Sequence, residues 1–267
     1  MVMKKGFWII LCMFFIPPVT FAGNMKLHYD RPAEYFEEAL VIGNGTMGAT
    51  LYGGVKKDKI SFNDITLWTG EPESENSSPD AFNTIPEIRA LLDNEDYQGA
   101  DKAQYKVQGH YSENYQPLGT LTIEYLDDTA GISDYHRWLD IGNATARTQY
   151  LKDGKLFTSD YFASAPDSVI VIRLKSENKE GIHASLSFDS PLPHSSQVAD
   201  NEISVEGYAA YHSFPVYYKA EDKHRYDPER GIHFKTLVRV LSVDGSVKDR
   251  YSDSRIEIDG STEVLIL

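Results

Sequence analysis

The feature that most restricts the fold of this chain is a series of strand-like segments that runs from Leu118 to the end of the sequence. Apolar and polar residues alternate in these segments, and a period of two gives a sheet one buried face and one wet face. The clearest apolar positions are Leu121, Ile123 and Tyr125 in one segment and Ile182, Ala184, Leu186 and Phe188 in another. Two packed sheets bury such faces most simply, so residues 23–267 are predicted to form a mainly β fold, a large two-sheet β-sandwich.

Asp-Gly pairs mark the turns of this sandwich. Asp153-Gly154 separates two strand-like runs, 144–151 and 156–162. Both residue types tolerate the positive φ angles of a type I′ turn, so the two runs are predicted to form a β-hairpin. Asp244-Gly245 and Asp259-Gly260 are predicted to separate later strands in the same way.

Two further segments are apolar at successive positions, Val169–Leu174 and Leu237–Val243. Strands that are covered on both faces have this composition. We therefore expect both segments to lie between packed layers.

A small helical insert interrupts the strands. Thr84 and Glu87 form a capping-box pattern, which predicts that Thr84 caps the principal helix. A second helix is predicted from Asp96 to about Gln108, although Gly99 weakens it.

The N-terminus has the pattern of a secretory signal peptide over residues 1–22. Two lysines precede an apolar run, Phe7–Ile16, and Ala22 supplies a small residue for cleavage. A single-pass anchor is the alternative, but the apolar run is short for a membrane span. The expected location is secreted or periplasmic, with no membrane association after cleavage. The single cysteine, Cys12, lies in this segment, so no disulfide is expected in the mature chain.

Charge narrows the range of partners. The net charge is -14, and removal of residues 1–22, which hold two lysines and no acids, makes it -16. Such a field repels phosphate backbones, so no nucleic-acid partner is expected.

Gly43–Gly48 matches the G-x-G-x-x-G pattern of dinucleotide sites. In those sites a helix follows the glycines and its N-terminus meets the pyrophosphate. Here the next residues, Ala49–Val55, are strand-like. The glycines are therefore predicted to permit tight turns, and no cofactor is expected.

Other catalytic patterns are weak. The eight histidines show no metal-ligand spacing, so no metal site is predicted. The carboxylate pairs Glu37-Glu38 and Asp127-Asp128 could supply an acid and a base for glycoside chemistry, but adjacent residues of a strand point to opposite faces. A solvated surface is the favoured interpretation of these acids.

Five aromatic residues gather in one irregular segment. They are Tyr208, Tyr211, Phe214, Tyr217 and Tyr218. Such rings stack on sugars or anchor another domain, because each offers an apolar face and most offer a polar tip. Packing beneath a loop is the alternative, and it is equally compatible with the sequence.

Motifs near the N-terminus resemble a known enzyme family. The order and spacing of three of them, Ala39–Ala49, Gly53–Val55 and Phe62–Pro72, are similar to the opening of the family 95 glycoside hydrolases, the α-L-fucosidases. Matches continue at Ile88–Leu92, Tyr115–Gly119 and Tyr161–Asp167. The resemblance covers nearly the whole mature chain.

The resemblance implies an N-terminal β-sandwich domain, of the large kind called a super-sandwich. In that family a catalytic (α/α)6 barrel follows it, and this barrel is absent here. Family members cleave terminal α-L-fucosyl linkages, some act on α-L-galactosides, and they invert the configuration without a metal. The expected partners are a fucosylated oligosaccharide and the missing barrel. No catalytic residue is expected in residues 1–267.

The candidate site residues are supporting ones. Asn63 and Trp68 lie in the family-like segment expected near the barrel, and Tyr211 and His212 lie in the aromatic segment. They are predicted to bind substrate or to contact the other domain. A free-standing carbohydrate-binding or interaction module is the alternative. The apolar final run, Val264–Leu267, favours a domain that normally continues.

Overall fold

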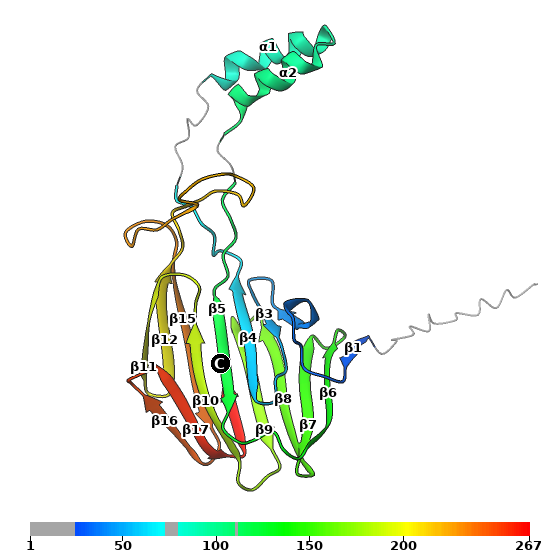
Figure 1. The fold of residues 1–267 in the computed structure, drawn as a ribbon, viewed down its shortest axis with the longest axis vertical. Helices are drawn as coiled ribbons and strands as arrows, with labels where there is room; N and C mark the ends of the chain where they lie inside the picture. The colour runs from blue at the N-terminus through cyan, green and yellow to red at the C-terminus, as the bar shows by residue number, and fades with distance from the viewer. Residues whose placement is uncertain (1–24, 73–79, 110–111) are drawn as a thin grey trace, which may run out of the picture.

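The structure is a computed structural model that describes residues 25–72, 80–109 and 112–267. Two β-sheets face each other, and a pair of helices stands beyond one end of them (Figure 1). The predicted mainly β sandwich with a small helical insert is confirmed. The described residues contain no (α/α)6 barrel. The predicted signal peptide, residues 1–22, and Cys12 within it lie outside the described part of the chain.

Within the described residues, one sheet has nine strands and the other has seven, and all neighbours are antiparallel. The nine-stranded sheet has the order β1 (Lys26–Tyr29), β6 (Ile132–Asp140), β7 (Thr145–Lys152), β8 (Lys155–Ser164), β9 (Val169–Ser176), β18 (Glu263–Ile266), β15 (His233–Ser242), β12 (Glu202–Tyr208) and β11 (His194–Ala199). The seven-stranded sheet has the order β16 (Ser246–Arg250), β17 (Arg255–Ser261), β10 (Ile182–Asp189), β5 (Gly119–Tyr125), β4 (Lys57–Asp64), β3 (Met47–Leu51) and β2 (Leu40–Gly43).

The remaining elements are short. They are the ribbon β13 (His212–Ser213) with β14 (His224–Arg225), the helices α1 (Ala81–Asp93) and α2 (Tyr97–Gln104), and the 3₁₀ turns η1 (Phe36–Glu38) and η2 (Tyr105–Val107).

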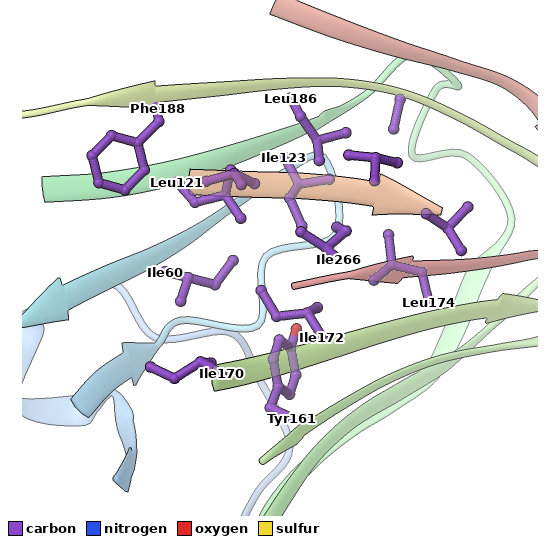
Figure 2. Packing of buried hydrophobic residues seen from close by; sticks show 14 of the residues in the cluster. Ile60, Leu121, Ile123, Tyr161, Ile170, Ile172, Leu174, Leu186, Phe188 and Ile266 are labelled. Atoms are coloured by element: carbon purple, nitrogen blue, oxygen red, sulfur yellow. The ribbon is translucent and has the colours of Figure 1, made fainter. Parts of the chain in front are cut away.

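The core lies between the two sheets, and Figure 2 shows its packing. Ile60 of β4, Ile123 of β5 and Leu174 of β9 all belong to this core, and all three are fully buried. Burial of each such side chain contributes about 1.5–3 kcal/mol. The alternation seen in the sequence therefore identifies the faces that hold the sandwich together.

The hairpin prediction is confirmed at one Asp-Gly pair and wrong at another. Asp153 and Gly154 have φ angles of 50° and 73°, as a type I′ turn requires, and they join β7 to β8. Asp244-Gly245 separates β15 from β16, but these two strands lie in different sheets and form no hairpin. Asp259-Gly260 instead lies inside β17, where the register against β10 shifts and Gly260 has a φ of 73°. The positive φ there serves a β-bulge rather than a turn.

Thr84 does not cap the principal helix. Helix α1 begins at Ala81, and the Thr84 hydroxyl donates to the carbonyl of Asp80 at 2.9 Å. Thr84 therefore lies one turn inside the helix, where its hydroxyl bonds a carbonyl instead of accepting from a free amide. The second helix is confirmed, since Asp96 caps α2 by accepting from Gly99 N at 2.9 Å and η2 follows directly.

One of the two doubly apolar strands is covered as expected, and the other is not. In β9, Ile170, Val171, Ile172 and Leu174 are all buried. In β15 only alternate residues are buried, whereas Leu237 and Leu241 are 49% and 48% exposed. The expectation that Leu237–Val243 lies between layers is wrong, because no described element packs on the outer face of β15.

The glycine-rich motif is a hairpin. Strand β2 ends at Gly43, β3 begins at Met47, and the turn between them includes Gly45 with a φ of 93°. A strand follows where a dinucleotide site needs a helix, so the turn interpretation is confirmed.

Asp58 is a buried carboxyl at the start of β4. Its Oδ1 accepts from Gly54 N and Lys59 N at 2.9 Å each, and its Oδ2 accepts from the Tyr161 hydroxyl at 2.8 Å. Burial raises its pKa to about 6, although these hydrogen bonds oppose the shift. The folded state therefore holds a proton that the unfolded state loses near its pKa of 3.8.

This shift predicts that the protein loses stability as the pH rises from about 4 to about 6, and that the loss persists at higher pH. A shift of about two units corresponds to roughly 3 kcal/mol. Asp58→Asn keeps the Oδ1 acceptor and removes the titration. Urea unfolding of both proteins at pH 4 and pH 7 measures the effect. Between these two pH values, the free energy of unfolding of the wild type should fall by roughly 3 kcal/mol more than that of the variant. Equal differences at the two pH values would contradict the prediction.

Candidate functional site: the loop end of the sandwich

Three loops meet at the end of the sandwich that lies nearest the helices, and together we call them the loop end (Figure 1). They are residues 65–72 after β4, residues 112–118 before β5, and residues 209–232 between β12 and β15. Strands β4 and β5 are neighbours in one sheet, and β12 and β15 are neighbours in the other. The sandwich therefore brings the three loops together although they are far apart in sequence.

Backbone hydrogen bonds join the loops. Gly70 N donates to Ala210 O at 2.9 Å, and Gln116 N donates to Leu67 O at 2.9 Å. Thr69 N donates to Asn114 O at 2.8 Å, and the Asn114 side chain donates to Ser213 O at 2.9 Å. These bonds cross all three segments, so the loop end is a defined surface.

Glu113 is the polar centre of the loop end. Its Oε1 lies 2.7 Å from His212 Nδ1, and its Oε2 accepts from Ser213 N at 2.9 Å and from the Thr69 hydroxyl. A carboxylate bonded to one ring nitrogen of a histidine fixes the orientation of the ring and leaves the other nitrogen for a further partner. His212 is thus held in place by a group from a different loop.

An aromatic pair lies on the surface of the loop end. The rings of Trp68 and Tyr115 have centroids 5.4 Å apart, and each residue is 43% exposed. The indole N–H of Trp68 donates to Ile65 O at 3.0 Å, which sets the ring orientation. Fixed, half-exposed rings of this kind offer apolar faces to a sugar or to another protein surface.

Tyr211 lies under a cation. The guanidinium of Arg230 is 3.6 Å from the centre of the Tyr211 ring, and its Nε donates to Glu71 Oε2 at 2.9 Å. The hydrogen bonds from Arg230 hold the pKa of Glu71 below its usual value. The hydrogen bond from Arg230 to Glu71 joins the third loop to the first, and the contact between Arg230 and Tyr211 lies within the third loop.

Phe214 continues the aromatic surface beside His212. Its ring meets the His212 ring edge-on with centroids 4.4 Å apart, and it stacks on Tyr218 at 4.8 Å. His212, Phe214 and Tyr218 therefore form one aromatic cluster at the loop end, whereas Tyr208, at the end of β12, packs against Tyr226 and His233.

The structure brings three of the four predicted site residues together. Trp68, Tyr211 and His212 belong to the loop end, whereas Asn63 is the last residue but one of strand β4 and donates to Gln116 O at 3.4 Å. Asn63 therefore lies at the base of the same surface. Their predicted roles in binding substrate or another domain stay predictions.

Trp68 and the five aromatic residues of the predicted segment differ in exposure. Trp68 and Tyr218 are exposed, and Tyr217 is 77% exposed. Tyr208, Tyr211 and Phe214 are half-buried. None of the six is fully buried.

Sequence reasoning missed Glu113, Tyr115 and Arg230. Tyr115 begins a motif that the sequence did show, but its neighbour Glu113 is one acid among 40 acidic residues. Its importance comes from contacts across about 100 positions, which no local pattern reveals.

Two general features bear on possible ligands. Among the residues that the structure describes, no group of three or more His, Cys, Asp or Glu side chains is arranged to hold a metal ion. In the same part of the chain, the helices fall short of the length and apolarity that a membrane crossing needs.

Comparisons with known proteins agree with the resemblance at the level of a glycoside hydrolase domain. A family model described as "Glycosyl hydrolase family 65, N-terminal domain" matches residues 27–267. The alpha-L-fucosidase 2 of Arabidopsis thaliana is 28% identical over 250 residues, which are 91% of this chain and 30% of that protein. The probable alpha-fucosidase A of Aspergillus niger is 28% identical over 179 residues, which are 63% of this chain and 22% of that protein.

The chain thus spans less than a third of the length of these relatives. The matching model carries the number 65, whereas the sequence motifs resembled family 95. Both point to the same kind of domain, and the match covers almost all of the residues that the structure describes. The chain belongs to the family of N-terminal domains described for glycosyl hydrolase family 65.

Proposed function

We propose that this chain is the N-terminal, non-catalytic domain of a secreted α-L-fucosidase of the family 95 type. The observation that carries the proposal is the match of 91% of the chain to the alpha-L-fucosidase 2 of Arabidopsis thaliana. The substrates would be glycans with terminal α-L-fucosyl or α-L-galactosyl linkages. Secretion rests on the signal-peptide pattern of residues 1–22.

The acids at the loop end support a non-catalytic role. Inverting glycosidases need a carboxylic acid and a carboxylate base on opposite sides of the bond, with room for a water beside the base. Glu113 is engaged by His212, Ser213 and Thr69, and Glu71 is engaged by Arg230. Groups held in this way position loops, and the proposal assigns acid–base chemistry to an (α/α)6 barrel outside residues 1–267.

The loop end would face that barrel or its substrate. Trp68 and Tyr115 offer exposed ring faces, and the polar groups of Glu113 and His212 lie on the same end of the sandwich. A free-standing carbohydrate-binding module is the second candidate, because exposed rings of this kind also stack on sugars without a catalytic domain.

The test uses the longer protein that contains this chain. We expect it to release L-fucose from 2′-fucosyllactose, and we expect Trp68→Ala to lower kcat/KM about tenfold or more with little change in Tm. Tyr251→Ala is the matched control, since Tyr251 is also exposed but lies in the turn between β16 and β17.

Loss of activity in the Trp68 variant alone supports the proposal. A Trp68 variant with unchanged kcat/KM would overturn the role of the loop end. If the isolated chain binds 2′-fucosyllactose by itself and the longer protein does not cleave it, the binding-module candidate replaces the enzyme domain.

A further inference from the structure

Strand β18 is much shorter than the two strands it lies between. Ile266 pairs with Ile172 of β9 on one side and with Val240 of β15 on the other. Beyond this point β9 continues for three residues, to Val169, and β15 continues to His233. Figure 1 shows the C-terminus midway along the sandwich. The nine-stranded sheet therefore has a gap between β9 and β15.

Backbone groups on both sides point into this gap. Arg239 and Leu267 exchange two N–H···O bonds of 3.0 Å, so the backbone of Arg239 faces β18. Because this direction alternates along a strand, the N–H and C=O groups of Leu237 and Lys235 face the same way. In β9, Ser176 N donates to Thr262 O, so by the same rule Ile170 faces the gap. Within the described chain, β18 offers these groups no partner.

An apolar groove of about 610 Å³ occupies the gap. Ile170 and Val169 of β9 and Phe234 and Val238 of β15 form its sides, and Leu121, Phe188 and Phe62 of the facing sheet form its floor. Figure 2 shows Ile170 and Ile172 across the core from Leu121 and Phe188. The groove thus lies in the core layer, in line with β18.

A polar atom at the groove also lacks a partner. The hydroxyl oxygen of Thr236 is buried, and it has no hydrogen-bond partner among the described residues. Thr236 lines the groove. A buried hydroxyl without a bond is costly, so its presence indicates that a further group belongs here.

We propose that the groove is an acceptor for an extended strand that continues β18 beyond Leu267 in a longer protein. A continuing strand would be antiparallel to both neighbours and would bond Leu237, Lys235 and Ile170, as existing pairs do. The relatives are long enough to supply it, since this chain covers 30% of the Arabidopsis protein. The proposal concerns folding, and it does not depend on which reaction the longer protein catalyses.

The register specifies the chemistry of this strand. Ile266 points into the core, so the first, third and fifth residues after Leu267 would point into the groove and the second and fourth would point outward. The first residue would lie opposite Val238, the third opposite Thr236 and the fifth opposite Phe234. The expected sequence has apolar residues at the first and fifth positions and a hydrogen-bonding side chain at the third.

The test lengthens the 267-residue chain by six residues after Leu267. Val-Thr-Thr-Lys-Val-Lys places valines inward and threonine opposite Thr236, whereas Thr-Val-Lys-Val-Thr-Lys has the same composition with the valines outward. We expect the first extension to raise Tm by about 5 °C or more and the second to raise it by less than about 2 °C. The amides of Leu237 and Lys235 should exchange with solvent at least about tenfold more slowly in the first extended chain.

A cross-link measures the position of the strand directly. In a Cys12→Ser background, Leu237→Cys should form a disulfide with a cysteine at the second position of the extension, which would lie opposite it. A cysteine at the third position, which points into the groove, should not. Equal Tm values for the two extensions, or equal cross-linking at both positions, would overturn the proposal. Neither readout uses fucosidase activity, so this failure is distinct from failure of the proposed function.

Discussion

Arg137→Ala is expected to lower the free energy of unfolding by about 3 to 5 kcal/mol. Arg137 lies on β6, is 1% exposed, and donates from Nε to Arg31 O at 2.7 Å and from Nη1 to Glu38 O at 2.8 Å. Its guanidinium also lies 4.1 Å from the centre of the Tyr29 ring. Removing the side chain leaves two carbonyls without their donor and an empty space beneath the N-terminal segment.

Urea unfolding at neutral pH measures this loss, and two further variants define its origin. Arg137→Lys should have an intermediate cost, because an ammonium group cannot reproduce the two fixed donors of a guanidinium. Arg250→Ala is the matched control, since Arg250 forms an exposed ion pair with Glu257. We expect it to cost less than about 1 kcal/mol. Equal losses for Arg137→Ala and Arg250→Ala would show that the buried contacts of Arg137 do not hold the N-terminal segment.

The buried arginine also shows why the sequence predicts some features and not others. Alternation identified β5 and β10 because each core residue in them is apolar. Arg137 is a charged residue at a buried position, and its partners are carbonyls about 100 positions away. Local hydrophobicity therefore predicts the sheets, while the groups that attach loops to them depend on long-range contacts.

Local turn chemistry has a similar limit. Asp153-Gly154 and Asp259-Gly260 have the same residues. The first pair forms the turn of the hairpin β7–β8, whereas the second forms a β-bulge inside β17. Positive φ is common to Gly154 and Gly260, and only the pairing with neighbouring strands distinguishes them. The start of α1 was mispredicted for a related reason, because a threonine hydroxyl can accept from an amide or donate to a carbonyl.

In the candidate site, too, residue type predicts some members, whereas others are defined only by long-range contacts. Trp68, Tyr211 and His212 could be selected from residue type and resemblance, and they lie at one end of the sandwich. Glu113 joins their loops, but its segment has no distinctive composition. Its role depends on β4, β5, β12 and β15 placing three loops together.

The second prediction with a large expected effect is the catalytic activity of the isolated chain. The chain alone is expected to have no α-L-fucosidase activity, because inverting hydrolysis needs two carboxyl groups about 6.5–9.5 Å apart with a water between the base and the sugar. Asp58 is buried beneath Tyr161, and Glu113 is bonded to three groups of the loop end. Under the proposed function, the catalytic pair belongs to a domain outside this sequence.

The direct measurement is L-fucose release from 2′-fucosyllactose by the purified 267-residue chain and by a longer protein that contains it, assayed at equal molar concentrations. The account predicts turnover by the longer protein and none above background by the chain alone. Turnover by the chain that survives further purification, and that disappears when Glu113 or another carboxylate within residues 25–267 is replaced by its amide, would contradict it.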